Sequence, residues 1–183
     1  MARLIHLNGP PGIGKSTLAA RYADSSPGTL NLDVDAVHRL VGGWQNEQID
    51  TWPAVWSLVW AMAATHLTGG HDVILPQYAA DLDRIAEFEQ LAHRHGAGFR
   101  EVVLLTDREA AIERFERRAQ ETGDPWIRHH HRLIERAGGA AALKAMYDNL
   151  IEVVRLRPGT VVVPSTTGAV RETYDLLAAT LEI

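Results

Sequence analysis

Cysteine is absent from this chain of 183 residues. Its absence excludes disulfide bonds and any metal site built on thiolates. Long apolar runs are also missing, because no stretch approaches the roughly 18 residues of a transmembrane helix, so no membrane partner is expected. Positive charge is not in excess either: 18 Lys and Arg face 23 Asp and Glu. The net charge of -5 therefore gives no support to nucleic-acid binding.

Internal repeats and low-complexity segments are absent as well. The hydrophobic fraction of 46% and the charged fraction of 22% are ordinary for a globular protein. The length suits one domain with a full core, so residues 1–183 are expected to form a single domain. The first apolar run starts within a few residues of Met1, which leaves no room for a signal peptide and predicts a cytoplasmic location.

One stretch carries a specific pattern, because every fixed position of G-x-x-x-x-G-K-[ST] is matched by Gly9-Pro10-Pro11-Gly12-Ile13-Gly14-Lys15-Ser16. An apolar run over residues 4–7 reads as a buried strand before it, and residues 17–22 read as a helix after it. Glycines let the backbone approach a phosphate chain, and the amides at a helix N-terminus then point at the anion. The sequence therefore predicts a phosphate-binding loop.

The predicted ATP site extends over Gly9, Pro10, Pro11, Gly12, Ile13, Gly14, Lys15, Ser16 and Thr17. Lys15 is expected to reach the β- and γ-phosphates, and the Ser16 hydroxyl to ligate Mg²⁺. Thr17 adds a neighbouring hydroxyl.

Two carboxylates follow the second expected strand, residues 29–32. Asp33 and Asp35 alternate along the chain, so an extended backbone sends them to the same side. They stand at the carboxyl end of a strand, where open α/β sheets bind ligands. The functional interpretation is one Mg²⁺-linked carboxylate and one general base. A solvated loop pair is the alternative.

Residues 36–70, the cap segment, are rich in tryptophan. Trp52, Trp56 and Trp60 recur every four residues and share one helical face. Such a stripe is either part of the core or an aromatic wall beside an acceptor pocket. The candidate acceptor contacts in this segment are His38 and Trp56.

The third expected strand, residues 72–75, runs into Pro76-Gln77-Tyr78. Many P-loop NTPases place a metal-binding aspartate at this point. The metal carboxylate must here come from elsewhere, and Asp33 is the natural candidate beside Ser16. Gln77 and Tyr78 are expected at the rim of the acceptor pocket, with a plain strand-end turn as the alternative.

Residues 117–138, the lid segment, begin on a helix with two arginines on one face. Arg114 and Arg118 are four residues apart, ahead of a glycine-containing turn and a basic stretch. A mobile lid with guanidinium groups can stabilise a transferring phosphate. A solvated charged helix is the alternative. The triple histidine at 129–131 fits one metal ion poorly, because consecutive helical residues splay by about 100°. In a late loop, Thr167 is a candidate contact to the nucleotide.

Strands and helices alternate along the whole chain, which predicts an α/β domain with a parallel sheet. The P-loop, the Asp-x-Asp pair, the missing aspartate after the third strand and the arginine helix together resemble the small P-loop kinases. That group includes shikimate kinase, gluconate kinase, chloramphenicol phosphotransferase and the zeta toxins. The resemblance implies a P-loop NTPase fold: three α/β/α layers, a five-stranded parallel sheet of order 2-3-1-4-5 and a helical lid.

The resemblance also implies transfer of the ATP γ-phosphate to a hydroxyl of a small acceptor. By this likeness Asp33 would face the metal and Asp35 the acceptor, with Lys15, Arg114 and Arg118 completing the catalytic set. The third strand lacks the glycine triplet of shikimate kinase, so shikimate is not expected. An apolar or aromatic acceptor, such as an antibiotic or a nucleoside-like metabolite, suits the tryptophans better.

Other functions stay open at this point. They are a nucleotide or nucleoside kinase, a toxin acting on a nucleotide sugar, and a non-kinase nucleotide-binding regulatory ATPase. The expected partners are ATP with Mg²⁺ and a small-molecule acceptor, without nucleic acid or membrane, in a monomer or homodimer.

Overall fold

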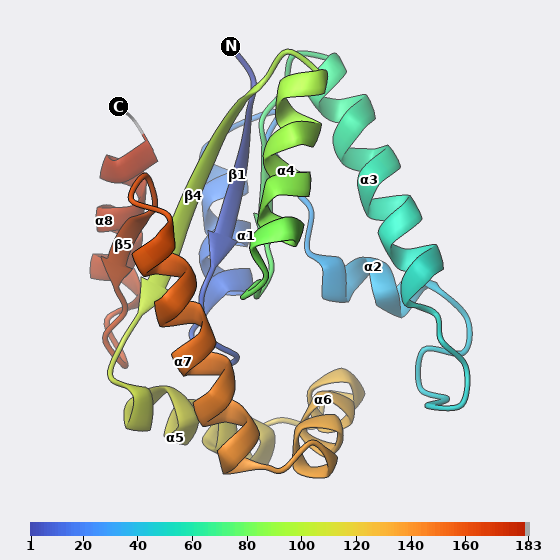
Figure 1. Cartoon of the computed structure of the whole chain (residues 1–183), viewed down its shortest axis with the longest axis vertical. Helices are drawn as coiled ribbons and strands as arrows, with labels where there is room; N and C mark the ends of the chain where they lie inside the picture. Colours follow the sequence, from blue (N-terminus) through green and yellow to red (C-terminus); the bar gives the residue numbers. More distant parts are fainter. Residues whose placement is uncertain (182–183) are drawn as a thin grey trace.

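The structure is a computed structural model that describes residues 1–181 (Figure 1). Its elements, in chain order, are β1 (Arg3–Asn8), α1 (Lys15–Ser25), β2 (Leu30–Asn31), α2 (Val34–Leu40), α3 (Trp52–Thr68), β3 (Val73–Pro76), α4 (Leu82–Arg94), β4 (Gly98–Leu105), α5 (Arg108–Glu121), α6 (Pro125–Arg136), α7 (Ala140–Leu156), β5 (Val161–Pro164) and α8 (Val170–Leu181).

The strands form one five-stranded sheet in the order β2-β3-β1-β4-β5. Every neighbouring pair is parallel, with Ile5 of β1 opposite Ile74 of β3 and Arg100 of β4. The predicted sheet order is therefore confirmed. Because parallel strands end at the same edge of a sheet, the chain segments that follow β1, β2 and β3 gather at one end of the molecule.

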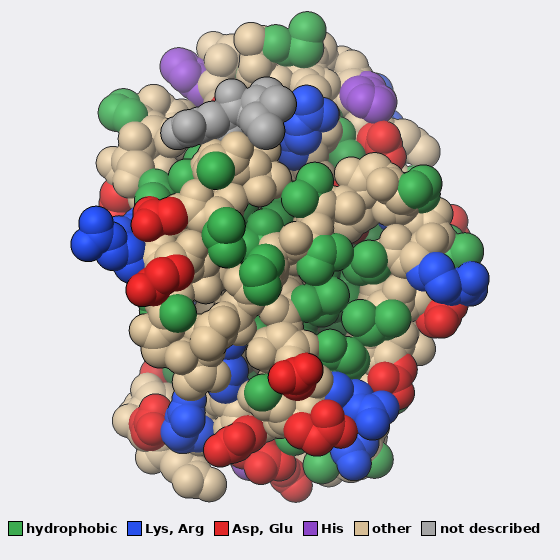
Figure 2. All heavy atoms as spheres, turned by 90° about the vertical axis from the view of Figure 1, so that its left-hand side faces the viewer, with side chains coloured by type: hydrophobic (Ala, Val, Ile, Leu, Met, Phe, Trp, Pro, Cys, Tyr) green, Lys and Arg blue, Asp and Glu red, His purple; other side chains and the backbone are tan. Residues whose placement is uncertain are grey.

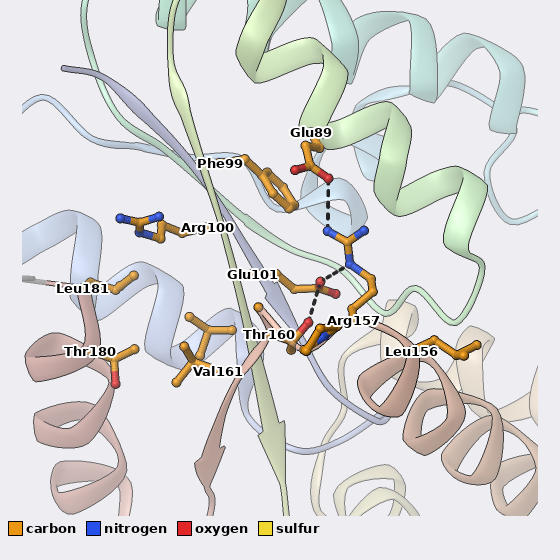
Figure 3. Close-up of a pocket in the computed structure, with 13 residues that line it drawn as sticks. Glu89, Phe99, Arg100, Glu101, Leu156, Arg157, Thr160, Val161, Thr180 and Leu181 are labelled. Atoms are coloured by element: carbon orange, nitrogen blue, oxygen red, sulfur yellow. Dashed lines mark hydrogen bonds and ion pairs between the residues drawn. The ribbon is translucent and has the colours of Figure 1, made fainter.

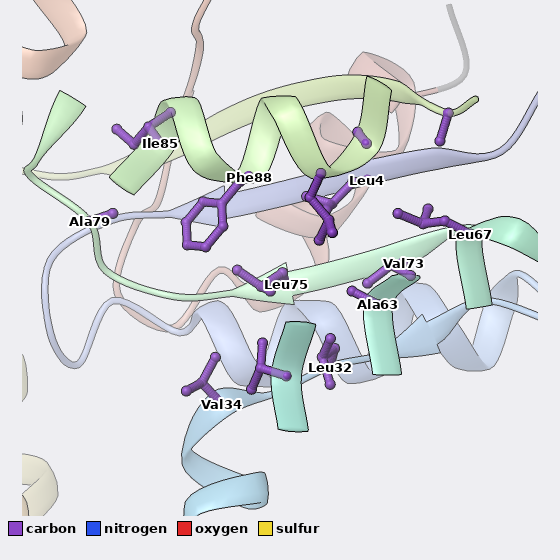
Figure 4. Packing of buried hydrophobic residues seen from close by; sticks show 14 of the residues in the cluster. Leu4, Leu32, Val34, Ala63, Leu67, Val73, Leu75, Ala79, Ile85 and Phe88 are labelled. Atoms are coloured by element: carbon purple, nitrogen blue, oxygen red, sulfur yellow. The ribbon is translucent and has the colours of Figure 1, made fainter. Parts of the chain in front are cut away.

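The core lies on both faces of this sheet, as the alternation of buried strand residues requires. Leu4, Val73 and Leu75 pack with buried residues of α3 and α4 (Figure 4). Their sequence neighbours Ile5 and Ile74 pack on the opposite face with α1 and α8. The fold thus has the three α/β/α layers expected of the P-loop NTPase class.

The open edge of the sheet at β5 carries apolar side chains. Figure 2 shows hydrophobic side chains gathered on the side of the molecule that carries β5, α7 and α8. The exposed large hydrophobic residues of these elements are Ile151, Leu156, Val161, Val162, Val170 and Leu176. Within residues 1–181, every helix is too short or too polar to cross a membrane.

A partly buried polar network lies near the amino ends of β4 and β5, away from the P-loop. It borders a hollow of about 730 Å³. Arg157 donates from Nε to Glu101 Oε2 at 2.7 Å and from Nη2 to Glu89 Oε2 at 3.1 Å (Figure 3). Thr160 Oγ1 donates to the same Glu101 oxygen at 2.8 Å. These bonds tie the turn between α7 and β5 to strand β4.

His6 connects this network to the loop after β3. It is fully buried on β1, with Nδ1 3.8 Å from Glu101 Oε1. Its Nε2 lies 2.9 Å from the Gln77 carbonyl oxygen, which can only accept, so Nε2 carries the proton. Desolvation lowers the pKa of His6 to about 4, although Glu101 and the Gln77 carbonyl act to raise it. The ring is therefore neutral at pH 7.

The pKa of His6 predicts acid sensitivity of the fold. Below pH 6.5, His6 binds a proton in the unfolded chain but stays neutral in the folded chain until the pH approaches about 4. The free energy of unfolding therefore falls as the pH falls through this range. The His6 contribution amounts to about 3 kcal/mol between pH 6.5 and pH 4.

Thermal melts between pH 7.5 and 4.5 should show a shallower decline for His6→Gln, whose amide can still donate to Gln77. The exposed His93→Gln variant, the control, should follow the wild type. Superimposable profiles for wild type and His6→Gln would contradict this prediction.

Candidate active site

The P-loop connects β1 to α1 and packs tightly against the rest of the fold. Gly9 has φ 147°, and a Cβ there would lie 2.8 Å from the Leu104 carbonyl oxygen. Gly12 has φ 78°, and a Cβ there would lie 2.9 Å from Phe115 Cα on α5. Both positions exclude side chains by conformation and by space. The loop is therefore seated between β4 and α5.

Lys15 opens α1 and turns its ammonium group back over this loop. Nζ donates to the carbonyl oxygens of Gly9, at 2.8 Å, and of Pro10, at 3.0 Å. Desolvation lowers the pKa of Lys15 to about 8; Asp35 and Asp33 raise it, and Arg118 lowers it. At pH 7 the group is still protonated, so it provides a positive charge inside the concave loop.

Asp33 and Asp35 lie together for a reason different from the one that the sequence indicated. The chain leaves β2 after Asn31 and enters α2 at Val34, so no extended strand carries the two carboxylates. Asp33 is the N-cap of α2, and its Oδ1 accepts from the amides of Asp35, at 2.9 Å, and Ala36, at 3.4 Å. Asp35 is in the first turn. The expected alternation along a strand is wrong, but the expected convergence is observed, because both side chains line one cavity.

Asp33 and Ser16 fit a Mg²⁺ ion by their chemistry. Burial raises the pKa of Asp33, and the nearby Asp35 raises it further, whereas hydrogen bonds from Ser16 and from the helix amides lower it. Mg²⁺ binds few protein ligands, which are oxygen atoms, and keeps several water molecules, so a hydroxyl beside a carboxylate suits it. A group of three or more His, Cys, Asp or Glu side chains able to hold a metal is not found among residues 1–181.

The cavity has a volume of about 400 Å³ and is enclosed by the P-loop, the cap segment, the loop after β3, and helices α5, α6 and α7. Its lining comprises Pro11, Gly12, Gly14, Lys15, Ser16, Thr17, Asp33, Asp35, Ala36, Arg39, Trp52, Pro76, Gln77, Tyr78, Phe115, Arg118, Ala119, Asp124, Trp126, Ile127, His130, Leu133, Ile134 and Met146. Charged groups that suit a phosphate-transfer site thus share one space with a largely apolar and aromatic wall.

Of the predicted acceptor contacts, Gln77 and Tyr78 line the cavity and His38 and Trp56 do not. Tyr78 donates its hydroxyl to the Met146 carbonyl oxygen at 2.9 Å, and burial raises its pKa to about 12. His38 is buried behind the wall, with Nε2 2.6 Å from Thr51 Oγ1. Trp56 packs on Trp60 and Phe88, one helical turn beyond the cavity.

Trp126 and His130 line the cavity but were not predicted as site residues, and Trp52 lines it as a member of the predicted tryptophan stripe. Trp52 belongs to the same stripe as Trp56 but stands at the start of α3. On α6, Trp126, Ile127, His130, Leu133 and Ile134 follow the spacing of one helical face, which the sequence does carry. That periodicity could have predicted an inward-facing side for the lid helix.

The lid and the cap touch directly. Arg39 of α2 pairs with Asp124 at the start of α6, with Nη1 3.2 Å from Oδ2. Arg136 pairs with Glu47 of the cap. Trp126 packs against His38 and Trp44 of the cap, each with ring centroids 5.1 Å away. The cavity is therefore roofed by contacts between α6 and the cap segment.

The two arginines of α5 have different surroundings. Arg114 donates from Nη1 to the Ser165 carbonyl oxygen and from Nη2 to the Ile13 carbonyl oxygen, each at 3.0 Å. It lines a second hollow of about 240 Å³ beside the P-loop, together with Ser165 and Thr166. Thr167 does not line this hollow. Arg118 borders both spaces, so it stands between them.

This difference predicts different kinetic effects for the two arginines. Arg118→Ala should lower kcat by about 10²-fold or more with little change in nucleotide affinity, because its guanidinium can meet charge that develops during transfer. Arg114→Ala should mainly weaken nucleotide binding, because it frees the P-loop from the loop after β5.

The control is Arg117→Ala, which removes an exposed partner of Glu121 on the same helix. Steady-state kinetics and calorimetric titration with Mg-ATP separate the two effects. Equal losses of kcat in Arg114→Ala and Arg118→Ala, with affinity unchanged in both, would contradict the division.

Comparison with known proteins agrees with this geometry. The sequence pattern of a family described as an AAA domain matches residues 4–137. Among curated proteins, none matches the chain. The solved structures that resemble this one are less than 25% identical to it in sequence, so they show which fold the chain has.

Solved structures of three other proteins are examples of this fold. A gluconokinase from Sinorhizobium meliloti 1021 has a TM-score of 0.59 and 22% identity, over 97% of this chain and 93% of that one. A tunicamycin resistance protein from Deinococcus radiodurans has a TM-score of 0.62 and 17% identity, over 100% of this chain and 97% of that one. A chain of a Pnkp1/Rnl/Hen1 RNA repair complex has a TM-score of 0.69 and 18% identity, over 85% of this chain and 46% of that one. With a matching family pattern over most of its length, a P-loop and the sheet order 2-3-1-4-5, the chain belongs to the AAA domain family and has the P-loop NTPase fold.

Proposed function

We propose that the chain is an ATP-dependent phosphotransferase that moves the γ-phosphate to a hydroxyl group of a small molecule. One observation carries the proposal: Lys15, Ser16, Asp33, Asp35 and Arg118 line the same cavity as an apolar wall able to hold an organic acceptor. A binding module needs the P-loop, but it has no use for a second carboxylate facing a roofed cavity.

The proposed reaction uses groups of this chain at each end of the transfer. Asp35 takes the proton of the acceptor hydroxyl, whose oxygen forms the new bond to the γ-phosphorus. The bond from that phosphorus to the β,γ-bridging oxygen breaks, and its electron pair leaves with ADP. Lys15 and Arg118 stabilise the charge that develops on the phosphates. Ser16 and Asp33 would hold Mg²⁺, which neutralises phosphate charge when bound.

The remaining site residues have supporting roles in this proposal. Backbone N–H groups of Gly12, Ile13 and Gly14 face the phosphates, and the hollow beside Ser165 and Thr166 receives the nucleoside part of ATP. Gln77 and Tyr78 face the acceptor. Closure of the lid segment over the cap segment excludes water, so that the acceptor rather than water receives the phosphate.

The test is ADP release from Mg-ATP against a panel of metabolites, antibiotics and nucleosides, in the wild type and in Lys15→Ala. The proposal expects at least one acceptor to raise ADP release in the wild type only, with a phosphorylated product in the mass spectrum. A response confined to nucleosides would favour the nucleoside-kinase alternative. Tight Mg-ATP binding without Lys15-dependent transfer to any compound would favour a regulatory ATPase.

A further inference from the structure

We infer that the acceptor carries a planar, uncharged ring, which binds against the cavity surface formed by Trp52 of the cap and by Trp126 and His130 of the lid. The inference rests on the proposed phosphotransfer and adds the chemical class of the acceptor. Four polar residues of the cavity wall, Arg39, Asp124, Gln77 and Tyr78, already have hydrogen-bond partners inside the protein.

A polyol or sugar acid would find few partners on this wall. Arg39 and Asp124 pair with each other at 3.2 Å. The Tyr78 hydroxyl is used by the Met146 carbonyl oxygen, and Gln77 Nε2 donates to the Tyr78 carbonyl oxygen at 3.3 Å. A buried hydroxyl left without a partner loses its hydrogen bonds to water without replacement, so a compound rich in hydroxyls is disfavoured there.

An aromatic ring, in contrast, meets surfaces that are already fixed. The buried His38 ring packs on Trp52 with centroids 4.3 Å apart and on Trp126 with centroids 5.1 Å apart. His130 packs on Trp126 at 4.6 Å. Thr51 holds His38 by a bond of 2.6 Å, so the rings are supported from behind. Rigid aromatic side chains bind a planar group with little loss of conformational entropy.

His130 joins this aromatic surface to the reacting groups. Desolvation lowers its pKa and Asp35 raises it, while His129, Arg118 and Lys15 lower it further. A neutral imidazole at pH 7 can donate or accept one hydrogen bond near Asp35, which would orient the acceptor hydroxyl without attracting an anion. Among the described residues that line the cavity, Lys15 and Arg118 serve the phosphates and Arg39 pairs with Asp124, so an acidic acceptor meets no additional cation there.

The first test compares three probes: 2-phenylethanol, sorbitol and gluconate, with Mg-ATP and the full chain. We expect 2-phenylethanol to raise ADP release at concentrations at least about 10-fold below those needed for sorbitol or gluconate. Trp126→Phe and His130→Gln should raise its KM by about 3- to 10-fold without changing the KM for ATP. The matched controls are Trp60→Phe, in the core beside Phe88, and the exposed His93→Gln.

The outcomes separate this inference from the proposed function. If sorbitol or gluconate is the better acceptor and the activity depends on Lys15, phosphotransfer stands and the aromatic class is overturned. If no probe raises ADP release, saturation-transfer NMR with Mg-ADP measures binding alone. Millimolar binding of 2-phenylethanol that weakens in Trp126→Phe and His130→Gln supports the aromatic class and counts against phosphotransfer. Absence of binding at 10-fold higher concentration overturns the inference.

Discussion

Lys15→Ala is expected to reduce phosphoryl transfer by about 10²-fold or more and to leave the fold intact. The ammonium group lies over the P-loop, bonded to the Gly9 and Pro10 carbonyl oxygens, where it can neutralise charge on the β,γ-bridge during transfer. It is a partly dehydrated charge with a lowered pKa, so its removal should cost the fold little. The effect should appear mainly in kcat, because charge on the bridge grows most in the transition state.

The measurement is ADP release in the presence of a responding acceptor, beside circular dichroism and thermal melting. Lys144→Ala is a natural control, since Lys144 is the other lysine of the chain and is exposed on α7. Near-normal turnover in a correctly folded Lys15→Ala protein would refute the assignment of the P-loop as the site of transfer.

The fold could be predicted to the level of sheet order because its signals are local. A P-loop between an apolar strand and a helix is set by residues close in sequence, and it determines where the phosphate end of the sheet lies. The resemblance carried by that loop, by the Asp-x-Asp pair and by the arginine helix then implied the order 2-3-1-4-5, which the structure confirms.

The cavity wall could be predicted only in part, because it depends on how each helix is rotated about its axis and packed against its neighbours. The sequence placed Trp52 and Trp56 on one face of a helix, and they are on one face. Only packing of α3 against α4 decides that Trp56 covers Phe88 while Trp52, one turn earlier, reaches the cavity. Trp126 reaches it from α6, 74 residues further along the chain, a contact that spacing along one helix cannot reveal.

The arginines of α5 illustrate the same limit. Residues four apart share a helical face, and this much was predicted correctly. The Arg114 guanidinium nevertheless bonds to the Ile13 and Ser165 carbonyl oxygens, whereas Arg118, one helical turn later, borders the cavity. Position along the face, relative to the P-loop, decides the surroundings of each arginine.

Substitution by asparagine is expected to have different effects at Asp33 and at Asp35. Asp35→Asn keeps the shape and removes the basicity, so it should lower transfer by about 10²–10⁴-fold and leave Mg-ATP binding nearly intact. Asp33→Asn should instead weaken the apparent affinity for Mg²⁺, because the carboxylate beside Ser16 is lost. Asparagine is as good an N-cap as aspartate, so α2 should still form in the Asp33 variant.

A matched control exists for the capping role. Asp81 caps α4 away from the cavity, with its side chain accepting from the Asp83 amide at 2.9 Å. Asp81→Asn should therefore show the stability change of an N-cap replacement without any change in Mg²⁺ affinity or turnover. Calorimetric Mg-ATP titration beside a kinetic assay tests all three variants. Loss of nucleotide binding in Asp35→Asn, with loss of turnover alone in Asp33→Asn, would reverse the two roles. Unchanged behaviour in both would leave a P-loop without an acceptor base, as in a nucleotide-binding module.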